Sequence, residues 1–247
     1  MFSDGHRPRV GVRIGDSVLD LAGVLGEQVF AEPSLNAFMA QGRARWTDVR
    51  ARITELLMLD RHRAAVEAAL RSLSGVRLHL PFEVGDYVDF YASEQHAANV
   101  GRLFRPGAEP LTPNWKYMPI GYHGRSGTVV VSGTPVVRPN GQSVPPGATT
   151  PKSGPSRRLD FEAEVGFVVG VGSSGPVSVG RFADHVFGAF LVNDWSARDL
   201  QSWESRPLGP FLAKSFATSV SPWVVPLEAL DRARISRRRV TPSPCPT

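Results

Sequence analysis

The stretch from Leu159 to Val169 alternates acidic and apolar residues, and this pattern limits the conformations open to it. Period-two alternation is typical of a strand, because successive side chains of a strand point to opposite faces. Glu162 and Glu164 then share one face, with their side chains about 7 Å apart. Buried carboxylates stay ionised only near positive charge, because desolvation and like-charge repulsion both raise the pKa of a carboxyl group. The stretch therefore predicts a strand whose acidic face meets either a cation or water.

Two further carboxylates lie in apolar surroundings elsewhere in the chain. Asp89 alternates with Tyr91 within residues 86–91, and Asp194 closes the hydrophobic run 186–193. Strand ends and the loops after them are common places for functional sites. We therefore expect these carboxylates to converge with Glu162 and Glu164 around a divalent cation. An all-oxygen set of ligands favours Mg²⁺ or Ca²⁺ over softer metals.

Composition indicates a globular chain. With 247 residues, of which 42% are hydrophobic, it can bury a sizeable core in one large or two modest domains. No apolar run reaches the ~20 residues needed to span a bilayer, so we expect no membrane partner. The N-terminus lacks the basic and apolar regions of a signal peptide, which favours a cytoplasmic location. Cys245 is the single cysteine, so an intrachain disulfide is excluded.

The formal charge of +5 lies mostly at the C-terminal end. Residues 231–247 hold five arginines and one aspartate, so the rest of the chain is close to neutral. A nucleic-acid-binding surface requires basic residues gathered on a folded face. We therefore expect no nucleic-acid partner, and we expect residues 231–247 to form a basic, disordered tail.

Local patterns divide the remainder near residue 81. Residues 9–20 predict a hairpin, and two helical patterns follow, from Trp46 to Leu57 and from Ala64 to Leu73. Beyond residue 81 the sequence favours short strands separated by glycine and proline. We expect an N-terminal domain over residues 1–81 and a mostly β domain over residues 82–230.

Three local predictions concern the second region. Ser93 should cap a short helix that places His96 one turn inside it. Residues 128–137 should form a hairpin around Ser132-Gly133-Thr134. The Pro/Gly/Ser-rich residues 138–158 should form a loop before the acidic strand.

Five segments follow one another in the chain, over residues 86–101, 121–125, 159–164, 193–199 and 207–215. Together they resemble the fumarylacetoacetate hydrolase family, and the resemblance covers roughly residues 8–230. The segments 159–164 and 193–199 resemble the wider family, whereas 86–101 and 121–125 point to its fumarylacetoacetases. The fifth segment is Pro207-Leu208-Gly209-Pro210-Phe211-Leu212-Ala213-Lys214-Ser215. Five motifs in sequence are a far more specific signal than any one of them.

The resemblance implies a mainly β, α+β fold. It implies a small N-terminal SH3-like barrel domain followed by a mixed β-roll catalytic domain, and a homodimer. It also implies hydrolysis of a carbon–carbon bond in 4-fumarylacetoacetate, a small diketo acid, to fumarate and acetoacetate. This reaction is the last step of tyrosine and phenylalanine breakdown.

The resemblance also assigns roles to residues of this sequence. The matched metal ligands are Asp89, Glu162, Glu164 and Asp194, and the matched base is His96. The matched substrate-contacting or charge-stabilising residues are Tyr91, Arg105, Tyr122, Arg198, Gln201 and Lys214. These residue types suit the chemistry, because such a cleavage needs a base for water, a Lewis acid for the carbonyl and cations for the leaving enolate. The alternative for the tyrosines is a role as core aromatics, and for Arg198 a pair with a nearby aspartate.

After Leu230 the resemblance ends in Arg/Ser/Pro-rich residues, so we expect a catalytic domain truncated at its C-terminus, with sheet edges and apolar surface uncovered. Activity would then be impaired. Two rival hypotheses remain open: an acylpyruvate hydrolase or oxaloacetate decarboxylase-like enzyme of the same superfamily, and a catalytically inactive fragment.

Overall fold

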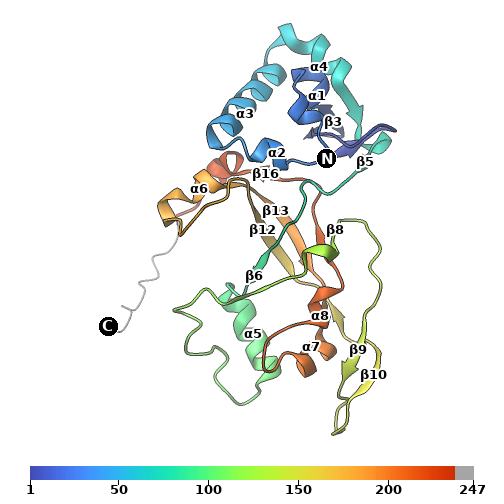
Figure 1. The fold of residues 1–247 in the computed structure, drawn as a ribbon, viewed down its shortest axis with the longest axis vertical. Coiled ribbons are helices and arrows are strands. Elements are labelled where there is room, and N and C mark those ends of the chain that lie inside the picture. Colours follow the sequence, from blue (N-terminus) through green and yellow to red (C-terminus); the bar gives the residue numbers. More distant parts are fainter. Residues whose placement is uncertain (237–247) are drawn as a thin grey trace.

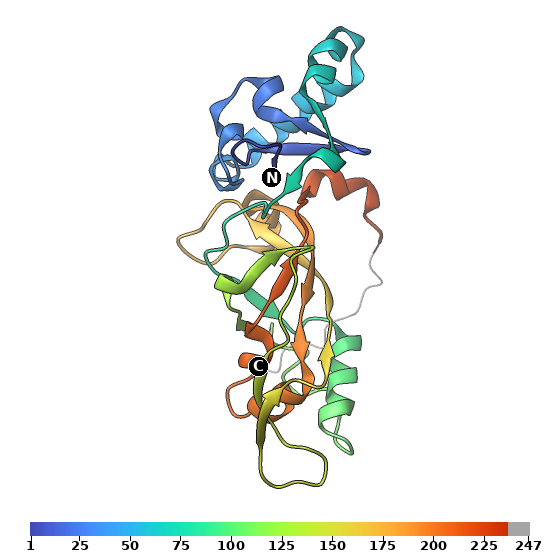
Figure 2. The ribbon, with the colours of Figure 1, turned by 90° about the vertical axis from the view of Figure 1, so that its right-hand side faces the viewer.

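The computed structural model describes residues 1–236, which form two parts stacked along the long axis of the molecule (Figure 1 and Figure 2). The N-terminal residues make the upper part in both views, and short strands dominate the lower part. The prediction of a mainly β, α+β chain is therefore confirmed. Within residues 1–236, no helix is both long and apolar enough to cross a membrane.

The N-terminal part combines two small antiparallel sheets with helices. Its strands are β1 (Phe2–Ser3), β2 (Gly11–Ile14), β3 (Ser17–Asp20), β4 (Leu70–Ser72) and β5 (Arg77–Leu78). Its helices are α1 (Leu21–Leu25), α2 (Asn36–Met39), α3 (Arg43–Met58) and α4 (Arg63–Ala69), with 3₁₀ turns η1 (Gln28–Ala31), η2 (Asp60–His62) and η3 (Leu73–Gly75). The sheets β2-β3-β4 and β1-β5 share no strand, so the expected barrel is not closed in the described residues.

Most local predictions for this part are confirmed. The hairpin β2-β3 turns at Gly15, whose φ of 55° suits a residue without a side chain. Helices α3 and α4 match the two helical patterns, with η2 between them. The second pattern was wrong at its end, because residues 70–72 leave the helix and form β4. Pairing of these residues with the open edge of β3 outweighs the helix propensity of Leu70 and Arg71.

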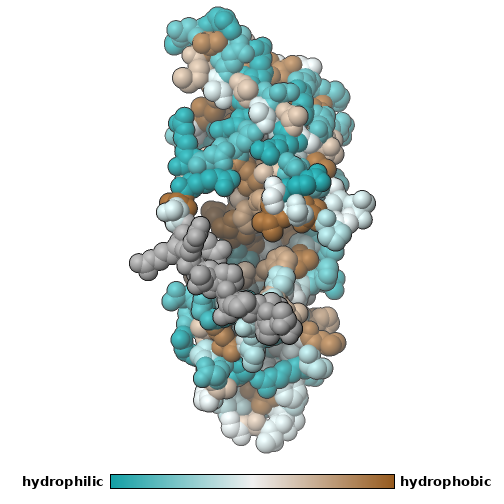
Figure 3. Space-filling model, turned by 90° about the vertical axis from the view of Figure 1, so that its left-hand side faces the viewer, coloured by the Kyte–Doolittle hydropathy of each residue, from teal (hydrophilic) through white to brown (hydrophobic). Residues whose placement is uncertain are grey.

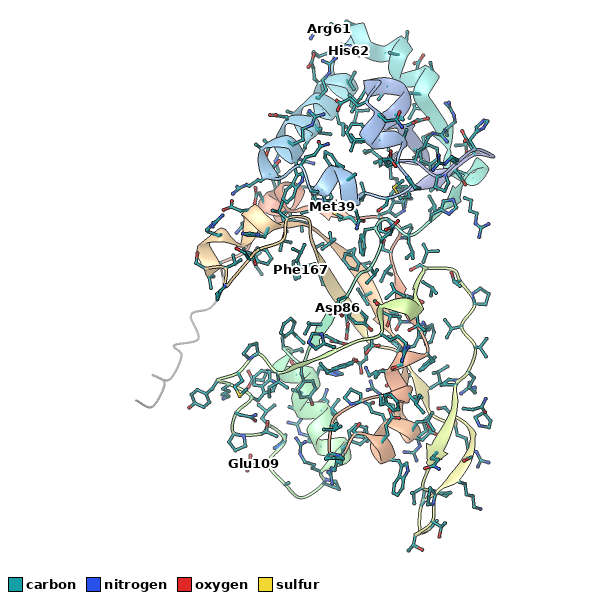
Figure 4. All side chains as sticks on the ribbon, in the orientation of Figure 1. Met39, Arg61, His62, Asp86, Glu109 and Phe167 are labelled. Atoms are coloured by element: carbon teal, nitrogen blue, oxygen red, sulfur yellow. The ribbon has the colours of Figure 1, made fainter. Side chains whose placement is uncertain are left out.

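An aromatic cluster joins the two parts. Phe187 from the lower part packs edge-on against Phe38 and Trp46, with 5.8 Å and 5.3 Å between ring centroids. The Trp46 indole N–H donates a hydrogen bond of 3.0 Å to the carbonyl of Met39, which is labelled at the junction in Figure 4. The strand that carries Phe187 is therefore held by the N-terminal helices at one end, and its other end carries Asp194.

The lower part is built from short strands around one larger sheet. Its strands are β6 (Val88–Phe90), β7 (Gly121–His123), β8 (Val129–Val131), β9 (Asn140–Ser143), β10 (Lys152–Pro155), β11 (Leu159–Asp160), β12 (Ala163–Val169), β13 (Val186–Asp194), β14 (Ser196–Ala197), β15 (Thr218–Val220) and β16 (Val225–Pro226). Its helices are α5 (Glu94–Phe104), α6 (Phe182–His185), α7 (Arg198–Glu204) and α8 (Leu212–Ser215), with 3₁₀ turns η4 (Ser126–Thr128), η5 (Val179–Arg181) and η6 (Leu227–Ala233). The larger sheet has the order β12-β13-β15-β8, and β16 also pairs with β13.

Two strand predictions were wrong in this part. Residues 128–137 do not form a hairpin, because β8 pairs instead in parallel with the distant β15. Pro135 has no N–H for a ladder, and Val137 is 84% exposed, so the second arm has neither pairing nor burial. The expected loop 138–158 contains the hairpin β9-β10.

The acidic stretch is also divided rather than being one strand. Residues 159–160 form β11, which pairs with β14, whereas β12 begins at Ala163 and pairs with β13. Glu162 lies between the two strands, where its backbone carbonyl accepts from the Asp194 N–H at 3.1 Å. The alternation of faces is kept, because Phe161 and Val165 are 65% and 60% exposed while Glu162 and Glu164 point inward.

The outer face of the larger sheet is apolar and largely exposed in the described residues. Its exposed side chains are Val165, Phe167, Val169 and Leu191, and the exposed Phe161 lies just before β12. The Phe167 ring packs edge-on against Phe182, with 5.7 Å between ring centroids. Apolar residues also gather at mid-height on the face seen in Figure 3, between the two parts. The predicted basic segment 231–247 begins inside η6, where residues 231–233 are helical rather than disordered, and its residues 237–247 lie outside the described residues.

Candidate active site

Strands β6 and β7 bring Asp89 and Tyr122 together. The two residues are direct partners in the antiparallel register, so their side chains lie on the same face. The Tyr122 hydroxyl donates to Asp89 Oδ2 at 3.1 Å and also lies 3.4 Å from Asp194 Oδ2. Tyr122 therefore links the β6-β7 ribbon to the end of β13.

Strands β12 and β13 place two more carboxylates beside Asp89. Glu164 lies opposite Val192 in the register, and Asp194 follows Val192 by two residues, so both acids point to the same face. One carboxylate oxygen from each of Asp89, Glu164 and Asp194 lies within 4.8 Å of the others. We call these three residues the acidic cluster.

The acidic cluster fits a hard divalent cation. The side chain of Asp194 is only 2% exposed, and its Oδ1 is buried with no hydrogen-bond partner in the described part of the chain. A buried carboxylate oxygen without a partner is costly unless a cation binds it. Three carboxylate oxygens this close together are the type of ligand that Mg²⁺ and Ca²⁺ prefer.

The acidic cluster holds protons more tightly than ordinary carboxyl groups do. Burial, followed by repulsion from Asp89, Asp194 and Glu162, raises the pKa of Glu164 to about 8. Burial also raises the pKa of Asp194 to about 7, although Lys214 opposes the shift. Burial also raises the pKa of Asp89. A bound cation would relieve the repulsion and displace these protons.

These raised pKa values predict how the stability of the metal-free protein depends on pH. The folded state keeps protons on Glu164 and Asp194 that the unfolded chain releases near pH 4, so their stabilising contribution is lost as pH rises through about 7 and 8. We expect the Tm in the presence of EDTA to fall between pH 5.5 and 8.5. The variant Glu164→Gln should flatten this dependence, and an equally steep fall in the variant would contradict the assignment. Thermal unfolding followed by circular dichroism checks it.

Next to the acidic cluster, two cations hold Glu162. Lys214, which is 5% exposed, contacts Glu162 Oε1 at 2.8 Å and also pairs with Asp194 Oδ2. Arg198 Nη1 lies 2.6 Å from the same Glu162 oxygen, and its Nε lies 2.9 Å from Asp160 Oδ2. Burial opposes ionisation of Glu162, but Lys214, Arg198 and His96 together lower its pKa to about 2. Its predicted role as a fourth metal ligand stays a prediction.

His96 lies at the edge of this arrangement. Helix α5 begins after Ser93, whose Oγ accepts from the His96 backbone N–H at 3.3 Å, so the predicted cap is confirmed. The His96 Nε2 atom lies 3.8 Å from Glu162 Oε2. Its ring packs edge-on against Tyr91, with 5.7 Å between ring centroids. A buried carboxylate and an aromatic ring therefore border the imidazole.

Three other residues expected at the site lie around this core. The Tyr91 hydroxyl donates to the Ala97 carbonyl at 2.9 Å. Gln201 Oε1 accepts from Arg198 Nη1 at 3.0 Å, so the amide nitrogen of Gln201 points away from Arg198. Arg105 ends α5 and donates to the Pro110 carbonyl at 2.8 Å. No hydrogen bond or ion pair within residues 1–236 joins Arg105 to the acidic side chains.

Two polar residues near the carboxylates were missed from sequence. Ser196, fully buried, donates from Oγ to Glu162 Oε1 at 3.2 Å. The Tyr87 hydroxyl lies 3.2 Å from the Thr218 hydroxyl, and burial raises the pKa of Tyr87. Ser196 follows Asp194 by two residues, and Tyr87 precedes Asp89 by two. Residues two apart in a strand point to the same face, so this spacing is the sequence signal that could have identified both residues.

Comparison with family models gives two matches. Residues 87–240 match the model described as fumarylacetoacetate (FAA) hydrolase C-terminal, and residues 1–81 match fumarylacetoacetase N-terminal. Among curated proteins, fumarylacetoacetase of Homo sapiens is 46% identical over 97% of this chain, and that of Caenorhabditis elegans is 48% identical over 90%. The chain spans 61% of the length of the human protein and 57% of the nematode protein.

Solved structures show the same fold at lower identity. Maleylpyruvate hydrolase from Sphingobium sp. SYK-6 has a TM-score of 0.53 at 18% identity, covering 93% of this chain and 67% of that one. Fumarylacetoacetate hydrolase from Exiguobacterium antarcticum has a TM-score of 0.52 at 18% identity, covering 94% of this chain and 67% of that one. A second structure of the maleylpyruvate hydrolase, with a TM-score of 0.53 at 17% identity and the same coverage, holds a manganese(II) ion and pyruvate.

Proposed function

The chain belongs to the fumarylacetoacetate hydrolase family, and on that premise we propose that it is a metal-dependent hydrolase of 4-fumarylacetoacetate. The carbon–carbon bond of the diketone is cleaved with water, and the products are fumarate and acetoacetate. The single observation that carries the proposal is the convergence of Asp89, Glu164 and Asp194 beside His96. The reaction is the last step of tyrosine and phenylalanine breakdown.

In this proposal Mg²⁺ or Ca²⁺ is held by the acidic cluster. The unpartnered Asp194 Oδ1 and the raised pKa values of Glu164 and Asp194 support a site built for a cation. Glu162 adds a fixed negative charge next to it. When bound, the ion supplies a Lewis acid that polarises the diketone oxygens.

His96 is the base of the proposed reaction. Its Nε2 accepts a proton from the attacking water, and the ionised Glu162 at 3.8 Å stabilises the imidazolium that results. The new carbon–oxygen bond forms at the carbonyl carbon, and the bond to the neighbouring carbon breaks. The proton held by His96 can then return to the carbon of the leaving enolate.

Cations and donors around the cluster stabilise negative charge. Lys214 stays protonated, because Asp194 and Glu162 raise its pKa although burial opposes the shift. Its ammonium and the Tyr122 hydroxyl lie beside the cluster, where they can orient the oxygens of a bound diketone and offset the charge of an enolate. The amide nitrogen of Gln201 is a further donor for the substrate.

Substrate choice tests the proposed function. With Mg²⁺ or Ca²⁺ present, we expect loss of the diketone absorbance of fumarylacetoacetate and formation of fumarate, at a kcat/KM above that for an acylpyruvate. Cleavage of the acylpyruvate alone would contradict the proposal and favour the rival enzyme class. Absence of metal-dependent cleavage of either compound would favour the inactive fragment.

The homodimer implied by the resemblance and the cytoplasmic location inferred from the N-terminal sequence stay predictions. The exposed apolar residues Phe161, Val165, Phe167, Val169 and Leu191 support association with another polypeptide surface.

A further inference from the structure

A second feature of the lower part is a cavity of about 370 Å³ between η4 and α8. It is lined by Tyr122, His123, Gly124, Arg125, Ser126, Gly127, Pro210, Phe211, Lys214 and Ser215. The lining includes two permanent cations, Arg125 and Lys214, and a histidine, but no carboxylate from the described residues. The cavity is therefore suited to an anion.

The inner wall of the cavity is shared with the acidic cluster. Tyr122 lines the cavity and donates a hydrogen bond from its hydroxyl to Asp89, and Lys214 lines it while pairing with Asp194. A ligand in the cavity therefore lies one side chain away from the proposed metal site. Lys214 is already bound to two carboxylates, so Arg125 is the cation better placed to bind an incoming anion.

Local contacts fix the segment that carries Arg125. The Gly124 N–H donates to the Tyr87 carbonyl at 3.2 Å, and a Cβ at Gly124 would lie 1.9 Å from the Tyr87 ring, so any side chain at this position would displace that ring. Thr128 Oγ1 lies 3.2 Å from the Arg125 carbonyl and 2.8 Å from the Ser215 carbonyl. Thr128 therefore connects the two walls of the cavity, and the shape of the cavity is preorganised.

Charge and shape together indicate the kind of anion. Arg125 is exposed, and no carboxylate within residues 1–236 forms an ion pair with it, so its guanidinium can bind a carboxylate through two parallel hydrogen bonds. Phe211, which is 58% exposed, and Pro210 add an apolar wall. A flat, unsaturated chain ending in a carboxylate would contact both the guanidinium and the apolar wall.

We propose that this cavity is a carboxylate subsite that binds the unsaturated acyl arm of the substrate, with Arg125 as its specificity-determining residue. The inference rests on the proposed function and extends it by naming the residue that recognises the fumaryl end. The ligand class is a trans-unsaturated four-carbon dicarboxylate. In this account Arg125 binds and positions the arm and takes no part in bond cleavage.

Binding of fumarate tests the subsite without requiring turnover. In calorimetric titrations we expect wild type to bind fumarate more tightly than succinate, which is flexible, or inorganic phosphate. Arg125→Ala should weaken fumarate binding by about tenfold or more, and Arg125→Lys should restore part of it. Arg63→Ala, at an exposed arginine of the N-terminal part, is the matched control and should bind as wild type does. Unchanged fumarate affinity in Arg125→Ala, or equal binding of phosphate and fumarate by wild type, would overturn the assignment.

Steady-state kinetics separate this inference from the proposed function. If the chain hydrolyses fumarylacetoacetate, Arg125→Ala should raise KM by about tenfold or more at nearly constant kcat. The reason is that the lost contact binds the substrate and the transition state equally well. A large fall in kcat at constant KM would overturn the positioning role. If wild type shows no hydrolysis, the proposed function fails, whereas the fumarate titrations still decide whether the subsite exists.

Discussion

Replacing Lys214 by methionine should destabilise the folded protein by about 3–5 kcal/mol, because removing one partner of a buried ion pair leaves uncompensated charge in the interior. Lys214 is 5% exposed and contacts Glu162, 9% exposed, and Asp194, 2% exposed. Methionine has a similar volume, so the loss is one of charge rather than of packing. Equilibrium unfolding in urea, followed by tryptophan fluorescence, measures the change in the free energy of unfolding.

Two further variants control the Lys214 experiment. Lys152 lies exposed in β10, and Lys152→Met should leave the free energy of unfolding nearly unchanged. The double variant Lys214→Met, Asp194→Asn should recover part of the lost stability, because one buried carboxylate is then neutral. A Lys214→Met protein as stable as wild type would show that the ion pairs do not hold this site together.

Replacing His96 by glutamine should lower kcat for fumarylacetoacetate by about 10²–10⁴-fold, the usual contribution of a general base. The variant should still take up metal, because His96 lies near Glu162 and is not one of the three carboxylates of the acidic cluster. Initial rates and calorimetric metal titrations on the same preparations separate the two functions.

The matched control for His96 is His62→Gln. His62 also lies near a carboxylate, Glu55 at 3.2 Å, but belongs to the N-terminal part. This variant should keep the wild-type kcat. An unchanged kcat in His96→Gln would remove the imidazole from the mechanism, and a parallel loss of metal uptake would show a structural role instead.

Local patterns predicted the elements whose interactions are themselves local. The hairpin β2-β3 depends on a turn at Gly15, and helix α5 depends on the Ser93 cap, and both were correct. Pairing between distant segments could not be predicted. Strand β8 joins β15, about 90 residues later in the chain, and no local pattern specifies that partner.

The candidate active site shows the same difference between local and long-range interactions. Alternation around Asp89 and the run that ends at Asp194 indicated which carboxylates face inward, and the family resemblance grouped them. The ion pair between Glu162 and Lys214 was not predictable from the strand pattern. It depends on the break between β11 and β12 and on Lys214, which lies about 50 residues away in the chain. Cations from α7 and α8 therefore bind a residue that sequence alone assigned to a metal.

A calorimetric titration of Mg²⁺ or Ca²⁺ into EDTA-treated protein tests the central claim most directly. The account predicts one site per chain, with protons released near pH 7, because Glu164 and Asp194 are partly protonated there in the metal-free protein. Glu164→Gln and Asp194→Asn should each weaken uptake by more than about tenfold, since ligand charge sets the affinity of such sites. Glu109→Gln, at an exposed glutamate, should match wild type. Equal uptake by wild type and by the Glu164 and Asp194 variants would contradict a metal site in the acidic cluster.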